Sequence, residues 1–237
     1  MSARDGAVAG RGGDAAAGAR EELRRMVAAG VRWPGDPTGL RLDPARVRRA
    51  AVLVLFGVLD SVPAHERNDG HVPADLDVLL QRRATTLGHH PGQVAFPGGG
   101  IDADDDGPVG AALREAVEET GLEPGGVEVL GTLGDVPLPV SNNVVTPVVG
   151  WWTTPSRVAA VDHREAVDVF RAPVADLLDP ARRAVVVHPV PRGRTRTPAF
   201  ELDGGVLVWG FTAIVLSGIF DALGWTVPWD EGRTVTP

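Results

Sequence analysis

Three glutamates stand within five positions in the stretch REAVEETGL, residues 114–122. Glu115 and Glu119 are four residues apart, so on a helix they form a like-charge pair that costs about 0.2–0.5 kcal/mol. Glu118 and Glu119 also come just before Gly121, a residue type that ends helices, so they face the negative end of the helix dipole. A cluster that breaks two local rules is typical of a functional site.

The segment before these glutamates suggests which chemistry they serve. Gly98, Gly99 and Gly100 follow a short apolar run, and the acidic loop IDADDDGP comes next. Glycines let backbone carbonyls approach a ligand closely. Carboxylate and carbonyl oxygens are the ligands that Mg²⁺ and Mn²⁺ prefer, and Mg²⁺ also keeps waters and substrate phosphates. We therefore expect a divalent-cation site for a phosphorylated substrate, whereas the alternative is an ordinary acidic helix surface.

A helix must position the cluster, and the sequence predicts one that begins near residue 105. Either Asp105 or Asp106 can cap its first amides, and Pro108 suits its first turn. At 100° per residue the apolar side chains form one stripe, and the three glutamates fall on the other side. Arg114 lies between the two faces, within reach of Glu118, and offsets some of the repulsion.

Strands come before and after this helix, in an order that predicts a mixed sheet covered by helices. The expected strands are 51–59, 77–83, a short one that ends in the glycine turn, 127–136, 143–152, 166–173 and 183–190. The uncharged run 204–220 has seventeen residues, which touches the lower limit for a membrane span. Its leading glycines and the strand-like VLVW favour a buried strand that leads into a buried helix.

Composition narrows the function classes. The chain has 237 residues, no cysteine and a net charge of −8. The absence of cysteine excludes disulfides and thiolate metal sites and favours the cytoplasm. The negative charge argues against a nucleic-acid partner, but a bound cation would still allow an anionic substrate. We expect no membrane partner. A homodimer stays open, because the sequence does not define the oligomeric state.

The amino-terminal region differs from the rest in composition. Residues 1–19 are rich in glycine and alanine without a signal-peptide pattern, so we expect a disordered arm. Residues 20–50 predict a helical extension with two short helices, at 21–29 and at 43–50, the second capped by Asp43.

The central residues resemble the Nudix hydrolases, whose signature is G-x5-E-x7-R-E-U-x-E-E-x-G-U, where U is aliphatic. The second half is matched in register by Arg114, Glu115, Ala116, Glu118, Glu119, Gly121 and Leu122. Strict spacing pairs Gly100 with Asp106, whereas a second alignment pairs Gly99 with Asp105 and adds one residue before Arg114. Either way an aspartate stands where glutamate is usual.

A narrower resemblance reaches upstream. LLQRRATTLGHHPGQVAFPGG, residues 79–99, is similar to the segment L-L-T-x-R-[SA]-x3-R-x3-G-x3-F-P-G-G of the coenzyme A pyrophosphatase branch. Two positions depart, since Gln81 replaces the threonine and Gly88 replaces the second arginine. Loss of an arginine removes a potential bidentate contact with a polyanion. ADP-ribose, NADH or another nucleotide diphosphate derivative therefore stays an alternative substrate.

The resemblance implies the α/β class and a Nudix-type α/β/α sandwich with a mixed sheet, over residues 51–223, with a tail at 224–237. It implies metal-dependent hydrolysis of coenzyme A or acyl-CoA to 3′,5′-ADP and (acyl-)4′-phosphopantetheine, with Mg²⁺ or Mn²⁺ as cofactor. A non-catalytic ligand-binding protein of this fold is a further alternative. The three retained glutamates argue against it.

The same resemblance assigns roles to the cluster. Glu115 and Glu119 are the expected first metal ligands, and Glu118 is a shared or second-metal ligand. The Gly99 carbonyl is a further candidate ligand, and Arg114 orients the glutamates.

Residues outside the cluster complete the expected site. Glu165, just before a predicted strand, is the candidate general base, and a glutamate of the signature is the alternative. Arg83 ends an apolar strand beside the glycine turn and is expected to contact a substrate phosphate. Gly98, Gly99 and His90 are expected to line the substrate site.

Overall fold

A mixed sheet of eight strands forms the centre of the computed structural model, which describes residues 6–33, 41–58, 75–83, 92–161, 166–190 and 193–237. Its long central strand, β1, is parallel to β7 and antiparallel to β2 and β4, and β5 and β6 extend the sheet beyond β7. The strands are β1 (Arg48–Val58), β2 (Leu76–Arg83), β3 (Val94–Ala95), β4 (Gly98–Gly100), β5 (Val127–Thr132), β6 (Val136–Leu138), β7 (Asn143–Trp152) and β8 (Ala166–Pro173).

The neighbouring strands β1 and β2 pair only over Phe56–Val58 and Leu76–Val78. Beyond that point they separate, and residues 93–101 run between them. This insert pairs first with β2 through β3 and then, after Pro97, with β1 through β4. The glycine turn therefore lies between two strands inside the sheet and is not a loop at the edge of the sheet.

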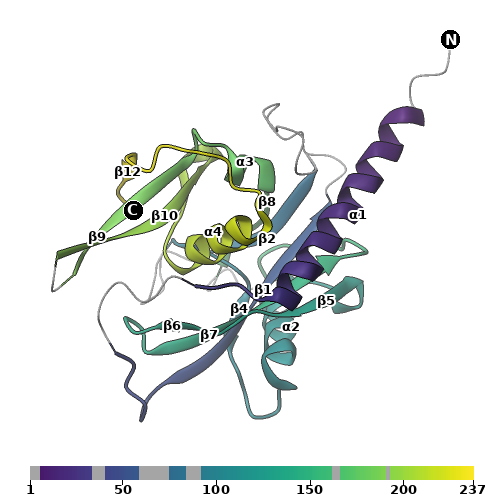
Figure 1. Ribbon diagram of the computed structural model, residues 1–237. Helices are drawn as coiled ribbons and strands as arrows, with labels where there is room; N and C mark the ends of the chain where they lie inside the picture. The colour runs from purple at the N-terminus through teal and green to yellow at the C-terminus, as the bar shows by residue number, and fades with distance from the viewer. Residues whose placement is uncertain (1–5, 34–40, 59–74, 84–91, 162–165, 191–192) are drawn as a thin grey trace.

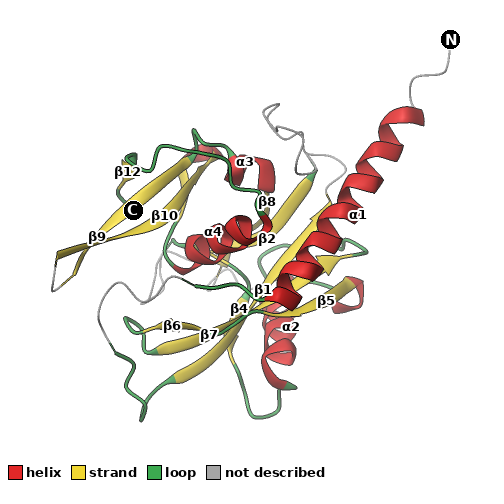
Figure 2. Cartoon of the chain, viewed as in Figure 1, coloured by secondary structure: helices red, strands yellow, loops and turns green. Residues whose placement is uncertain are grey.

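One face of the large sheet is covered by α2 (Gly107–Thr120), which carries the glutamates (Figure 2). Small side chains on α2 pack against leucines of the sheet; the buried members of this core are Ala51, Leu53, Leu55, Leu79, Ala111, Ala112, Ala116, Leu122, Val148 and Trp152. Alanines bring the helix close to β1, so the side chains on its flank reach the insert. As expected, Gly121 ends α2 in the left-handed conformation, with φ of 69°.

The opposite face is covered by α1 (Gly6–Ala29) and α4 (Phe211–Leu223), with α3 (Val174–Leu178) following β8 (Figure 1). A second sheet in the order β11-β10-β9-β12 packs beside α4. Its strands are β9 (Arg183–Val190), β10 (Gly193–Leu202), β11 (Val206–Val208) and β12 (Thr234–Val235), and two 3₁₀ turns lie at Pro124–Gly126 and Asp203–Gly205.

The α/β class with a mixed sheet between helices is confirmed. The run 204–220 forms a strand and a buried helix, as expected. In the described part of the chain, no helix combines the length and the apolar character needed to cross a membrane.

The amino-terminal region differs from expectation. The structure continues the helix predicted at 21–29 back to Gly6, into the arm expected to be disordered, and alanine-rich sequence favours a helix intrinsically. The short helix predicted at 43–50 is replaced by a turn followed by β1, which begins at Arg48. Pairing with β7 begins at Arg48 and Asn143, so sheet contacts override the local helix pattern.

The expected tail at 224–237 is also part of the fold. Thr234 and Val235 pair in parallel with β9, and Trp225 is buried beside Phe220. The Arg183 side chain is 2% exposed and lies between the rings of Phe200 and Trp229, which holds this segment against the second sheet.

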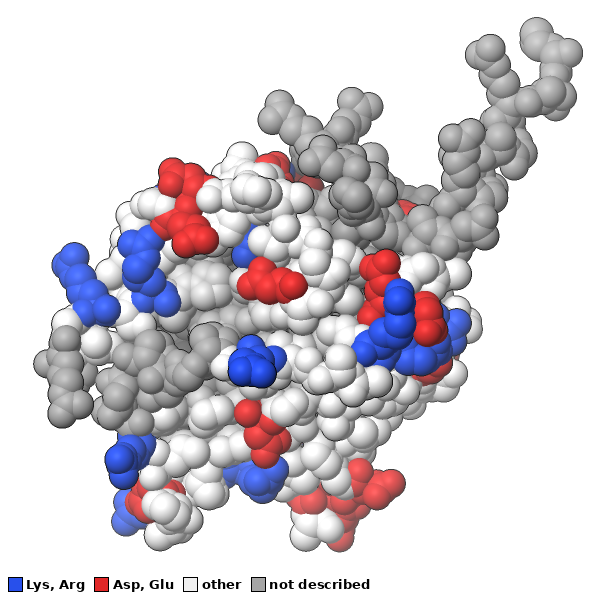
Figure 3. Space-filling view, in the orientation of Figure 1, with Lys and Arg blue, Asp and Glu red and all other residues white. Residues whose placement is uncertain are grey.

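Charged side chains of both signs are interspersed over the face of the described residues that Figure 3 shows. On that face the acidic residues responsible for the net charge of −8 do not gather into one large patch.

Candidate functional site

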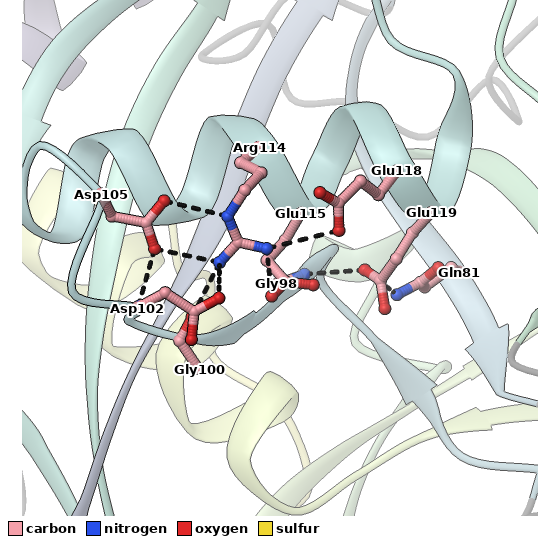
Figure 4. Close-up of polar contacts among 9 residues, drawn as sticks. All are labelled: Gln81, Gly98, Gly100, Asp102, Asp105, Arg114, Glu115, Glu118 and Glu119. Atoms are coloured by element: carbon pink, nitrogen blue, oxygen red, sulfur yellow. Dashed lines mark hydrogen bonds and ion pairs between the residues drawn. The ribbon is translucent and has the colours of Figure 1, made fainter.

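The Glu119 carboxylate lies against the insert and is held by two donors from different strands. The backbone N–H of Gly98 in β4 donates to its Oε2 over 2.8 Å, and Nε2 of Gln81 in β2 donates to the same oxygen over 2.7 Å (Figure 4). No described residue donates a hydrogen bond to the other oxygen, Oε1. The carboxylate is therefore fixed through one oxygen.

Glu115 lies one turn earlier on α2, directly over Gly99. A Cβ atom at Gly99 would stand 2.5–2.7 Å from the carboxylate atoms of Glu115, closer than any real contact. An alanine there would force the Glu115 carboxylate to move, because the carboxylate occupies the space of a side chain. Gly98 is more constrained, since its φ is +157° and a Cβ would meet the Ala51 carbonyl oxygen, a backbone atom, at 2.4 Å.

Arg114 links the glutamates to the acidic loop. Its Nη1 donates to Glu115 over 2.9 Å and to Glu118 over 3.3 Å. Its Nη2 donates to the Gly100 carbonyl over 3.0 Å and lies 3.6 Å from Asp102 (Figure 4). One guanidinium thus bridges the helix, the end of the insert and the loop.

The structure separates the two aspartates that the sequence left as alternatives. Asp105 accepts hydrogen bonds from Nε and Nη2 of Arg114, over 2.9 and 3.0 Å, and its side chain is 6% exposed. Asp106 occupies the N-cap position but makes no side-chain capping bond. Asp105 therefore fills the acidic position that pairs with Arg114, and the guanidinium holds the pKa of Asp105 below its usual value.

The electrostatics of the cluster follow mainly from the burial of its carboxylates. Burial raises the pKa of Glu119 to about 7, although the bonds from Gly98 and Gln81 act in the opposite direction. Burial also raises the pKa of Glu115, against the stabilising effect of Arg114. Negative charge at both positions is costly without a further cation, which is the pattern of a functional site.

The remaining predicted residues are placed only in part. Arg83 lies on β2, and its Nε is buried without a hydrogen-bond partner among the described residues. Its charge lowers the pKa of Glu119, although burial and hydrogen bonding have larger effects on that pKa. Glu118 is 58% exposed at the rim. His90 and Glu165 lie outside the described residues.

Two parts of the candidate site were not predicted from the sequence. Gln81 was noted only as a departure from a motif, although strand alternation places it on the same face as Arg83. The loop after β7 also contacts α2, because the N–H groups of Ala159 and Val161 donate to the carbonyls of Thr120 and Glu119, over 3.0 and 3.1 Å. These bonds satisfy free carbonyls at the end of the helix.

The donor set fits a hard divalent cation in its chemistry, since it consists of carboxylates beside a backbone loop that glycine keeps open. As they stand, Glu115 and Glu118 face Arg114, and Glu119 faces Gly98 and Gln81. Accordingly, no group of three or more acidic or histidine side chains in the described ranges is gathered so that it could hold a metal ion. Ligation would require these carboxylates to exchange present partners for the ion.

Comparison with known proteins gives a consistent match. A family model described as "NUDIX domain" covers residues 64–188, slightly more than half of the chain. Proteins named "Uncharacterized Nudix hydrolase NudL" from Salmonella paratyphi B and Salmonella newport are each 39% identical over 142 residues, which span 59% of this chain and 71% of the relative. Among solved structures, the NUDIX domain of Shewanella oneidensis NrtR complexed with ADP ribose has a TM-score of 0.40 at 23% identity, over 57% of this chain and 80% of that chain.

Proposed function

The chain belongs to the Nudix family of hydrolases, which act on diphosphate bonds, and on this basis we propose that it is a metal-dependent pyrophosphatase of coenzyme A or acyl-CoA. The products would be 3′,5′-ADP and 4′-phosphopantetheine or its acyl form. The resemblance of residues 79–99 to the coenzyme A branch supports this choice of substrate.

The observation that carries the proposed chemistry is the surplus of carboxylates over cations. Arg114 is within 4 Å of four carboxylates, and Glu119 lies beside them with a raised pKa; the four are Asp102, Asp105, Glu115 and Glu118. A divalent cation would offset this negative charge and would allow an anionic diphosphate to bind beside the carboxylates. When bound, the ion would neutralise charge on the diphosphate and position it for attack by water.

In this proposal some residues would bind the metal ion and others would orient these ligands. Glu115, Glu119 and Glu118 supply carboxylate ligands, and the Gly99 carbonyl supplies a further oxygen. Arg114 orients these carboxylates through its fork of donors. Its bidentate pairing with Asp105 fixes the guanidinium plane, so a change at either residue alters the position of Glu115.

Substrate contacts and the general base complete the proposal. Arg83 is proposed to bind a substrate phosphate, because its Nε has no hydrogen-bond partner among the described residues and its charge lowers the pKa of Glu119. Gly98 contributes by holding Glu119. His90 is retained as a residue that lines the substrate site. Glu165 remains the candidate base; its described neighbour Ala166 pairs with Arg83 across β2 and β8.

A second substrate class is favoured by one sequence feature. Gly88 removes an arginine that the coenzyme A segment has, so a site that binds fewer phosphates suits ADP-ribose, NADH or another nucleotide diphosphate derivative. The chemistry at Glu115 and Glu119 would be the same.

The test is hydrolysis of coenzyme A, ADP-ribose and NADH at equal concentrations, with Mg²⁺ or Mn²⁺ and with a chelator. Products are identified by mass spectrometry. We expect metal-dependent release of 4′-phosphopantetheine and 3′,5′-ADP from coenzyme A. A clear preference for ADP-ribose would replace the substrate and keep the chemistry, whereas no cleavage of any diphosphate would contradict the proposal.

A further inference from the structure

Gln81 is a buried polar side chain at the end of the buried part of β2. It is 1% exposed, and the buried residues that precede it on the strand include Leu79 and Leu80. A buried amide costs stability unless it is hydrogen-bonded. An apolar residue of similar size would fill the same space, so the amide needs a specific reason.

The hydrogen bonds of Gln81 supply that reason only in part. Its Nε2 donates to Glu119 Oε2 over 2.7 Å, which is the orientation that Glu119 requires when it is ionised, because the carboxylate can then only accept. Its Oε1 is buried without a hydrogen-bond partner in the described part of the chain. The amide nitrogen is thus engaged with a single residue of the candidate site, and the amide oxygen has no partner among the described residues that would offset its burial.

The geometry around Glu119 shows what the amide bond achieves. Gly98 N–H comes from β4 and Gln81 Nε2 comes from β2, and both point at the same carboxylate oxygen. Two donors from two strands fix the position of Oε2, and with it the direction of Oε1. Among the described residues no donor bonds to the second oxygen, so its lone pairs are available there, as a ligand of a cation requires.

We propose that Gln81 is a positioning residue, which locks one oxygen of Glu119 and thereby presents the other to the divalent cation. The inference rests on the proposed function, since it gives Glu119 the role of ligand. Side chains that orient a ligand in this way commonly change metal affinity or activity by 10–100-fold when they are removed.

The variants Gln81→Leu and Gln81→Asn test this role. Leucine keeps the volume and removes the donor, whereas asparagine keeps the amide and withdraws it by one methylene. Arg82→Gln is the matched control, because the neighbouring residue on β2 faces Asp168 on the other side of the sheet, with the charged atoms 3.9 Å apart.

The first measurement is Mn²⁺ binding without substrate by isothermal titration calorimetry, together with the metal-free Tm. We expect both Gln81 variants to raise the Kd for Mn²⁺ by about tenfold or more, with a metal-free Tm close to that of the wild type. The control should bind Mn²⁺ as the wild type does. Wild-type Mn²⁺ affinity in both Gln81 variants would overturn the inference.

Kinetics separate this inference from the proposed function. At saturating Mn²⁺ the Gln81 variants should lower kcat and leave the KM for coenzyme A unchanged, because the change acts through Glu119. If Mn²⁺ binding depends on Gln81 but the wild type cleaves no diphosphate, the positioning role stands and the proposed activity fails. If the wild type cleaves coenzyme A and the variants match it in both kcat and Kd, the activity stands and the role of Gln81 fails.

Discussion

At the scale of single residues, Arg114 organises the site because its guanidinium offers donors in a fixed plane. Two donors are taken by Asp105, and the others reach Glu115, Glu118 and the Gly100 carbonyl. A lysine has the same charge but no planar fork, so it cannot hold these groups in one geometry.

The variant Arg114→Lys should therefore lower kcat by about 10–100-fold while the protein stays folded. Arg24→Lys is the matched control, because Arg24 also pairs with two carboxylates, Glu21 and Glu128, but at the α1 surface. Steady-state kinetics and Tm would be compared for both. Equal activity of the two variants would show that the Arg114 fork does not organise the site.

Glu119 leads to a prediction that links activity and stability. Burial raises its pKa to about 7, so between pH 4.5 and about 7 the folded state binds a proton that the unfolded state does not. The metal-free protein consequently loses stability as pH rises through this interval. Glu119→Gln removes the titration. At pH 8 the metal-free variant should therefore be more stable than the wild type by about 1–3 kcal/mol in the free energy of unfolding, which appears as a higher Tm. At pH 5 the two Tm values should approach each other.

Calorimetry in a chelator at pH 5 and pH 8 checks this expectation. Asp77, whose pKa burial also raises to about 7, is unchanged in the variant, so the difference between the two proteins isolates Glu119. The same variant should lose orders of magnitude in kcat. A variant that is as active as the wild type, or whose Tm responds to pH as the wild type does, would contradict the assignment.

The sequence predicted where these residues lie on the helix better than it predicted their partners. The spacing of the glutamates on one helix flank follows from helix geometry alone. The contact between Arg114 and Glu118 was expected from their spacing of four residues. The bond between Gln81 and Glu119 joins residues 38 positions apart, and only the packing of α2 on the sheet brings them together. The same holds for the choice of Asp105 over Asp106, because it depends on the direction in which the loop turns.

At the scale of elements, the insert between β1 and β2 decides where the site lies. Its backbone pairs with both strands, so Gly98 and Gly99 are held as firmly as strand residues. A rigid backbone under Glu115 and Glu119 keeps both carboxylates in place, and small displacements of such groups are costly in catalysis.

Gly99→Ala tests the fit between the insert and α2. The added Cβ would lie 2.5 Å from a Glu115 oxygen, so the carboxylate must move, and we expect kcat to fall by about tenfold or more. Gly100→Ala is the control one residue away, where a Cβ meets nothing within 4 Å. Kinetics at saturating Mn²⁺ and Tm are the measurements. A Gly99 variant with the activity of the Gly100 variant would show that Glu115 tolerates displacement.

Most elements were predicted by their apolar patterns, and those that were missed have a physical reason. β10, GRTRTPAFEL, contains a proline and two exposed arginines, which weakened its strand pattern, although Thr195, Thr197 and Ala199 alternate as buried residues. β4 was expected only as a glycine turn; its three glycines have no apolar pattern, and the strand depends on its pairing with β1.

At the scale of the whole molecule, the folded unit extends beyond the matched residues 64–188 on both sides. β1 lies before the match and forms the centre of the large sheet, and α4 lies after it and fills the core under the opposite face. α1 adds Leu23 and Met26 to the same core, and its Arg20 and Arg24 pair with Glu128.

Leu23→Ala should therefore destabilise the protein by about 2–5 kcal/mol, because Leu23 is completely buried. Arg25→Ala, at an exposed position on the same helix, should change stability by less than about 0.5 kcal/mol. Urea unfolding of both variants gives the difference, and kcat of the folded protein should be unchanged. Equal stability of the two variants would mean that α1 is not part of the folded unit.

The parallel pairing of β1 with β7 also has a consequence for how the chain folds during synthesis. Arg48 lies opposite Asn143, so the apolar central strand has to wait until about 95 further residues have left the ribosome before it can form this pairing. During that interval β2 and β4 are already available as partners, but the edge of AVLVLFG that will pair with β7 is open, and such an edge associates with other chains. Contacts of such long range also slow folding, because loop closure must precede them. The nascent chain is thus most exposed to aggregation before β7 is complete, and a chaperone that covers the first strand would act in that window.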